Sequence, residues 1–170
     1  GFREMQEEEE AGDRAFARME VRRLEATGEP AVLAAPSKQA YAEGNRLAYD
    51  FLSGKVNLES NSEVHFRQEG NELHARNLDY QPGEDGRIGK FVAQGPGWLD
   101  WDMRDKDQPQ KNRRFRASWS HELSSIPPED LQIGDGLQII SVQGDAIVNV
   151  TDMGRIAADQ IHAWVYEEMP

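Results

Sequence analysis

The stretch AEGNRLAYDFLSGKVNLESNSEVHFRQEGNELHARNLDYQP, residues 42–82, contains one short phrase twice. EGNRLAYD (43–50) and ELHARNLDY (72–80) each place a small residue, an aliphatic residue three positions later and a tyrosine two positions after that. RIAADQIHAW (155–164) repeats the pattern with alanine in place of the tyrosine. Residues i and i+2 of a β-strand project from the same face, so each copy presents its last two members together. The small residue marks a place where a strand can bend or a neighbour can approach closely.

The segments around these phrases alternate apolar and polar residues in the same way, as in KVNLES (55–60) and EVHFRQ (63–68). Turn signals separate the segments at Ser53-Gly54, Asn61-Ser62, Gly70-Asn71 and PGEDG (82–86). Short strands with a turn roughly every 8–12 residues are typical of an all-β sandwich, barrel or jelly roll. Beyond the N-terminal segment, no part of the chain shows a convincing helical period. The sequence therefore predicts an all-β domain of curved antiparallel strands.

The chain divides into a leader and one domain. Residues 1–18 contain no proline and no β-branched residue, which favours a short helical or disordered leader. Residues 19–170 are expected to form the β domain, which begins as a strand, a turn at Gly28-Glu29-Pro30 and a second strand. A tryptophan-rich hairpin at about 95–122 looks like an insertion, and 124–130 is expected to be an irregular crossing. The segments 137–150 and 154–166 supply the last two or three strands.

The amino-acid composition limits which folds and which partners are possible for this chain. The 170 residues suit one domain, and a hydrophobic fraction of 38% requires apolar side chains to be concentrated on one face of each element, as in a sheet. The net charge of -12 repels a phosphate backbone and an anionic membrane surface alike. Nucleic acid is therefore not expected as a partner.

Motifs for catalysis and metal binding are not found in the sequence. There is no cysteine, and the 4 histidines, His65, His74, His121 and His162, show neither helical i, i+4 spacing nor an HExxH arrangement. No G-x-S-x-G elbow or phosphate-binding loop is present, and the many carboxylates fall into no distinctive pair. We therefore expect no catalytic residue, no metal site and no cofactor, and we interpret the chain as a non-enzyme.

The inward face of the predicted strands has two possible uses. In a closed sandwich it is only the hydrophobic core. In an incompletely closed jelly roll it is an apolar trough for acyl chains, in which each buried methylene contributes about 0.8 kcal/mol. Periodicity alone does not choose between these two interpretations.

The order of the phrases resembles the OstA/LptA-like family of lipopolysaccharide-transport proteins. That family has an A-x-G-x-P strand, a G-x-x-I-x-Y-D strand, an alternating strand that ends in glutamine, and a second G-x-x-I-x-Y strand. The likeness covers about residues 24–94 and, more weakly, 139–166. Its matching residues are Gly28, Pro30, Gly44, Leu47, Tyr49, Asp50, Val56, Leu58, Val64, Phe66, Gln68, Ala75, Leu78 and Tyr80.

Two features depart from the family pattern. Ser60 stands where the family usually has a glycine, and the region 95–135 has no counterpart and resembles an insertion that caps or walls the trough.

The resemblance implies an OstA-like open β-jelly roll that holds lipid acyl chains of a lipopolysaccharide-like amphiphile and pairs edge to edge with other OstA-like domains. It also implies a periplasmic or envelope-associated location and a role in outer-membrane assembly, with a signal or anchor expected before Gly1. The side chains expected to line the hydrophobic groove are Leu47, Tyr49, Val56, Leu58, Val64, Phe66, Leu78, Tyr80, Val148 and Ile161.

Two other functions remain open from the sequence. One is a structural or assembly module with a closed interior, which acts through β-edge pairing. The other is a carbohydrate-binding module that uses Trp98, Trp101 and Trp119 as stacking platforms.

Overall fold

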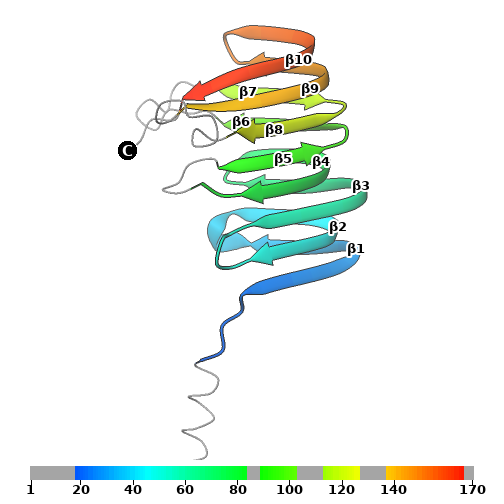
Figure 1. Cartoon of the computed structure of the whole chain (residues 1–170), viewed down its shortest axis with the longest axis vertical. Helices are drawn as coiled ribbons and strands as arrows, with labels where there is room; N and C mark the ends of the chain where they lie inside the picture. The colour runs from blue at the N-terminus through cyan, green and yellow to red at the C-terminus, as the bar shows by residue number, and fades with distance from the viewer. Residues whose placement is uncertain (1–17, 84–88, 103–112, 127–136, 167–170) are drawn as a thin grey trace, which may run out of the picture.

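The computed structural model of the chain describes residues 18–83, 89–102, 113–126 and 137–166, which form one antiparallel sheet of 10 strands (Figure 1). The strands stack from β1 at one end to β10 at the other. The all-β prediction is confirmed for the described residues, in which the single helical element is the 3-10 turn η1 (Pro36–Lys38). The strands are β1 (Arg23–Ala35), β2 (Ala40–Asp50), β3 (Val56–Gln68), β4 (Asn71–Gln81), β5 (Lys90–Gln94), β6 (Gly97–Asp102), β7 (Arg114–Trp119), β8 (Glu122–Ile126), β9 (Leu137–Val150) and β10 (Gly154–Tyr166).

Some of the sequence predictions concern residues that the structure does not describe. The predicted leader lies outside the described residues except for residue 18, and so does most of PGEDG. No helix in the described ranges has the length and apolar character needed to cross a membrane.

The long strands bend in the middle, so each contributes one half to each of two layers. The first layer contains β6 and β7 together with residues 31–35, 40–44, 64–68, 71–75, 146–150 and 154–158 of the long strands. The second layer contains β5 and β8 together with residues 23–27, 46–50, 56–59, 77–81, 137–143 and 160–166. Buried side chains from both layers form one hydrophobic cluster, so the layers enclose a common core.

Strand β4 pairs with β5 along one half and with β6 along the other, and β9 pairs with β8 and β7 in the same way. Strands β4, β5, β8, β9, β7 and β6 therefore close into a ring in the middle of the molecule. The tryptophan-rich hairpin expected at about 95–122 contributes to this ring. Although β6 and β7 do form a hairpin, they are two of the ring strands, and Leu99, Phe115 and Trp119 lie in the core.

The small residues of the repeated phrase mark the bends, as predicted. The register shifts after Glu43 in β2, next to Gly44, and after Ala158 in β10. In β4, Ala75 directly follows the residues that pair with β6 and precedes those that pair with β5. A Cβ atom on Gly44 would lie 2.9 Å from the Glu59 carbonyl oxygen, which shows how closely the neighbouring strand approaches there.

Asn45 connects the bends of three strands. Its side-chain amide donates to the Gly28 carbonyl of β1 at 3.2 Å, and its Oδ1 accepts from the Asn61 backbone N–H of β3 at 2.9 Å. The Ser60 hydroxyl also donates to Oδ1, at 3.0 Å. The serine that departs from the family pattern therefore takes part in the polar network at the bend.

Four local predictions require correction. Residues 23–35 form one bent strand and not a strand, a turn and a strand, and Asn61-Ser62 lies at the bend inside β3 and not in a turn. Residues 124–126 belong to β8 and not to an irregular crossing, whose remainder lies outside the described residues. The turn predicted at Gly70-Asn71 is one residue earlier, because Gln68 pairs with Asn71 and the positive-φ residues are Glu69 and Gly70.

Substituting alanine for Gly44 is expected to lower the free energy of unfolding by about 1–3 kcal/mol, because the added methyl group meets backbone and the Val64 side chain. Urea denaturation of the purified variant measures this loss. An unchanged midpoint would show that the bend does not need a glycine.

Candidate functional site

The side chains predicted to line the groove lie together inside the molecule. Those of Leu47, Val56, Leu58, Val64, Leu78, Val148 and Ile161 are buried members of the core cluster, and Tyr49, Phe66 and Tyr80 are half-buried and pack against it. The structure thus brings all of these residues to one interior. Their role in lipid binding stays a prediction.

The middle of this interior is filled by side chains. A cavity of about 40 Å³ remains between β3, β4, β5 and β6, with Phe66, Leu78 and Tyr80 among the residues around it. Pockets that enclose drug-sized ligands are roughly 300–1,000 Å³. In this conformation the hollow beside Phe66, Leu78 and Tyr80 is therefore too small to hold an acyl chain.

The interior is uncovered at the β1 end. Leu24 pairs with Tyr49 and Ala26 pairs with Leu47, so both β1 residues project toward the core side of the second layer. Leu24 nevertheless remains 45% exposed, because β1 is the last strand of the layer. In the other half of β1, Leu33 packs against the core. Only one half of this end is thus well covered.

At the β10 end, an inward face is also left uncovered, but it belongs to the first layer. Ile156 pairs with Val148 and Ala158 pairs with Ala146, both of which are core residues, so Ile156 and Ala158 project inward in the first layer. Ile156 is 59% exposed. Ile161, in the other half of β10, is buried. The two uncovered inward faces therefore belong to different layers at opposite ends of the molecule.

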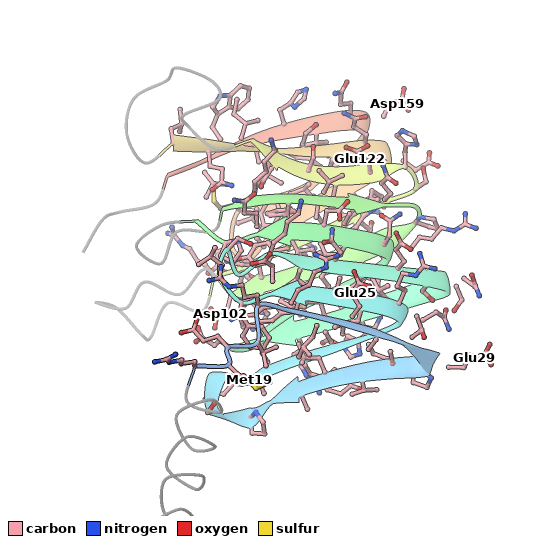
Figure 2. The ribbon with its side chains drawn as sticks, turned by 60° about the horizontal axis from the view of Figure 1, so that its bottom comes forward. Met19, Glu25, Glu29, Asp102, Glu122 and Asp159 are labelled. Carbon is pink, nitrogen blue, oxygen red and sulfur yellow. The ribbon has the colours of Figure 1, made fainter. Side chains whose placement is uncertain are left out.

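Charged side chains surround this interior on the outside. Figure 2 shows Glu29 on β1 and Asp159 on β10 at the edge of the ribbon, and Glu25 on β1 is also exposed. An apolar interior with uncovered ends and an acidic exterior suits an amphipathic or apolar ligand better than an anionic polymer.

The three tryptophans of the hairpin do not form one platform. Trp119 is buried in the core, Trp101 lies beside the central cavity, and Trp98 projects from the outer face. Trp98 stacks on His74 with the ring centroids 4.2 Å apart. A carbohydrate module that stacks sugars on all three rings is therefore not supported by this geometry.

Sequence reasoning missed the exposed Leu24 and Ile156 as candidate binding residues. Both continue the alternation of the interior face, but their exposure depends on which strands end the sheet, and alternation does not reveal that. Comparison of the chain with protein-family models, with curated proteins and with solved structures gave no match.

Proposed function

We propose that this chain is a non-enzymatic OstA-like domain of the cell envelope that joins other such domains end to end in a transport bridge and binds a lipopolysaccharide-like amphiphile where two domains meet. The observation that carries the proposal is the apolar interior face that reaches both end strands and is uncovered at each of them. We further propose that the fold is the open β-jelly roll of that family, with a periplasmic location. The phrase order in the sequence supports both points.

Strand direction supports end-to-end joining. Each layer contains segments of β1, β2, β3, β4, β9 and β10 together with two short strands, which are β6 and β7 in the first layer and β5 and β8 in the second. Every neighbouring pair is antiparallel. In such an alternating series of eight, the first and last segments run in opposite directions. A second copy stacked by translation would therefore place its β1 antiparallel to the β10 of the first copy, which continues both layers. Exposed sheet edges are natural templates for this kind of pairing.

The position of the uncovered residues supports the same junction. Leu24 projects from the second layer of one copy, and Ile156 projects from the first layer of the next. When both layers continue across the junction, these side chains face each other over the interior. We propose that acyl chains bind in this end region, because the central cavity of about 40 Å³ is too small for them.

Leu24→Asp and Ile156→Asp are each expected to weaken the binding of a dansyl-labelled fatty acid at least about tenfold, which corresponds to ~1.4 kcal/mol, because a carboxylate then lies in the apolar hollow. Fluorescence titration and native mass spectrometry measure this binding. Light scattering of the same samples, with and without lipid, measures assembly.

The chain offers a matched control for each variant. Val32 on β1 and Trp164 on β10 are 52% and 61% exposed, and they pair with the outward-facing Glu43 and Ile139. Val32→Asp and Trp164→Asp are therefore expected to leave fatty-acid binding unchanged. Equal losses in the inward and outward variants, or no binding by the wild-type chain, would contradict lipid binding.

The second candidate function is an assembly module without a lipid ligand, which the small central cavity favours. Concentration-dependent oligomers that form without lipid, together with no fatty-acid binding, would support it over the lipid-carrying proposal.

A further inference from the structure

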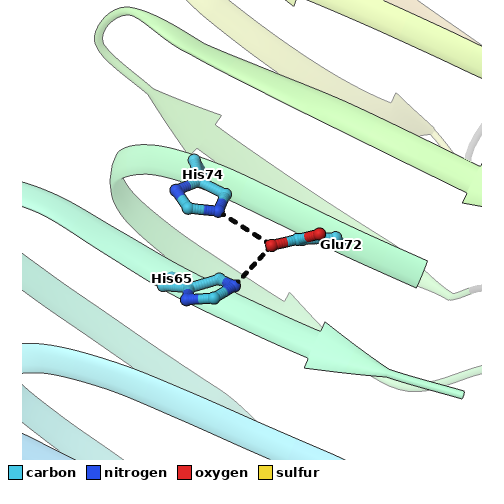
Figure 3. A group of neighbouring side chains, drawn as sticks. All are labelled: His65, Glu72 and His74. Carbon is cyan, nitrogen blue, oxygen red and sulfur yellow. Dashed lines mark hydrogen bonds and ion pairs between the residues drawn. The ribbon is translucent and has the colours of Figure 1, made fainter. Parts of the chain in front are cut away.

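Two histidines and a glutamate meet on the outer face of β3 and β4, away from the apolar interior. His65 of β3 pairs with His74 of β4, and Glu72 lies two residues before His74 on the same face. Glu72 Oε1 lies 2.8 Å from His65 Nε2 and 3.1 Å from His74 Nε2 (Figure 3). Figure 3 shows both imidazole rings turned toward the one carboxylate. The side chains are 25%, 35% and 18% exposed for His65, Glu72 and His74, so ions from solvent can reach them.

We propose that His65, Glu72 and His74 form a binding site for a divalent transition-metal ion of the Zn²⁺ class. One nitrogen from each histidine and one carboxylate oxygen lie within 4.8 Å of one another. Ligands at the usual ~2.0–2.2 Å from a tetrahedral zinc ion are about 3.3 Å apart. The two histidine–glutamate distances of 2.8 and 3.1 Å lie within about half an ångström of this value. The two imidazole nitrogens are at most 4.8 Å apart, and the partly exposed side chains can adjust that separation.

The surroundings of His74 also suit a metal ligand. Its Nδ1 is hydrogen-bonded to Glu63 Oε1 on β3. Histidines that bind metals through one ring nitrogen usually donate the other N–H to a carboxylate, which orients the ring and makes it a better ligand. Trp98 stacks on the same imidazole with an interplanar angle of 17°, so its orientation is fixed from a second side.

Hydrogen-bond accounting supports a cation at this position. A neutral imidazole carries one N–H, but both nitrogens of His74 face carboxylate oxygens. When the single N–H of His74 is on Nδ1 and points to Glu63, Nε2 carries a lone pair. A cation between Nε2 and the Glu72 carboxylate would then be attracted to both groups.

The set of two histidines and one carboxylate supplies three protein ligands and leaves a fourth position for water. Imidazole nitrogen with carboxylate oxygen suits zinc, and also copper and nickel, better than calcium or magnesium, which prefer oxygen ligands alone. The site does not depend on the proposed lipid function, because it lies on the outer face of the sheet.

The test is isothermal titration of the full chain with ZnCl₂ alone, with CaCl₂ as a comparison. We expect one zinc ion per chain and at least tenfold weaker binding of calcium. His65→Ala, His74→Ala and Glu72→Gln are each expected to remove zinc binding, and Glu63→Gln is expected to weaken it about 10–100-fold through the loss of the orienting hydrogen bond.

His162→Ala is the matched control. His162 is also an outward surface histidine beside a tryptophan, Trp164, but it lies on β10 outside the cluster. Circular dichroism checks that each variant is folded, and the wild-type titration by itself decides whether zinc binds. Failure of the wild-type chain to bind zinc, or equal binding by the His74→Ala and His162→Ala variants, would overturn the proposal and leave a simple histidine–carboxylate hydrogen-bond network.

Discussion

Replacing Trp119 with alanine is expected to lower the free energy of unfolding by about 3–5 kcal/mol, the range for removing a buried tryptophan. Only 4% of Trp119 is exposed, and its ring lies against the backbone of β6, since a Cβ on Gly97 would be 2.7 Å from the ring atom Cζ2. The indole therefore holds together the strand pair that completes the ring. Urea denaturation followed by circular dichroism measures the loss.

Two variants serve as controls for this result. Trp98→Ala removes a tryptophan of the same hairpin that is 39% exposed on the outer face, and it is expected to cost about 1 kcal/mol or less. Trp119→Phe is expected to cost less than Trp119→Ala, because Trp119 Nε1 is buried without a hydrogen-bond partner among the described residues and phenylalanine removes that polar group. A loss as small for Trp119→Ala as for Trp98→Ala would mean that the hairpin is an accessory element after all.

The second large effect is expected for Leu58→Ala, with a loss of about 2–5 kcal/mol in the free energy of unfolding. Leu58 pairs with Leu47 on one side and with Leu78 on the other, and all three belong to the buried cluster. Truncation leaves a void inside a closed core, which the surrounding strands cannot easily fill. The midpoint of urea denaturation is the measurement.

Leu24→Ala removes the same side-chain atoms from the uncovered end of the interior and is expected to cost about 1 kcal/mol or less, because roughly half of that side chain is in contact with solvent. The comparison therefore distinguishes a closed core from an open trough. If Leu58→Ala were as mild as Leu24→Ala, the middle of the domain would be an open trough, and acyl chains would have room there.

The hairpin of β3 and β4 shows how much of the zinc site was contained in the sequence. Placing the turn at Glu69-Gly70 pairs Gln68 with Asn71, and counting outward from that pair puts His65 opposite His74. A shift of one residue in the turn changes every partner, so the predicted turn at Gly70-Asn71 concealed the pair. Helical histidine spacing does not reveal the pair either, because these ligands come from two strands.

The sequence by itself determined which residues of the repeated phrases face inward and where β2, β4 and β10 bend. Alternation is a local property with a period of two, so Leu47, Leu58 and Leu78 are assigned to the interior without knowledge of their partners. Gly44 and Ala75 mark bends because the absence of a large side chain allows a close approach wherever the partner strand lies.

Only the tertiary structure decided how the strands close and where the interior is uncovered. The ring depends on β4 pairing with β5 along one half and β6 along the other, and these hydrogen bonds join segments whose partners no local pattern specifies. Leu24 and Leu58 carry the same side chain on the same inward face, but one lies in an end strand and the other between two neighbours. Their exposure differs because burial is set by the strands on either side, and that is a property of the whole sheet.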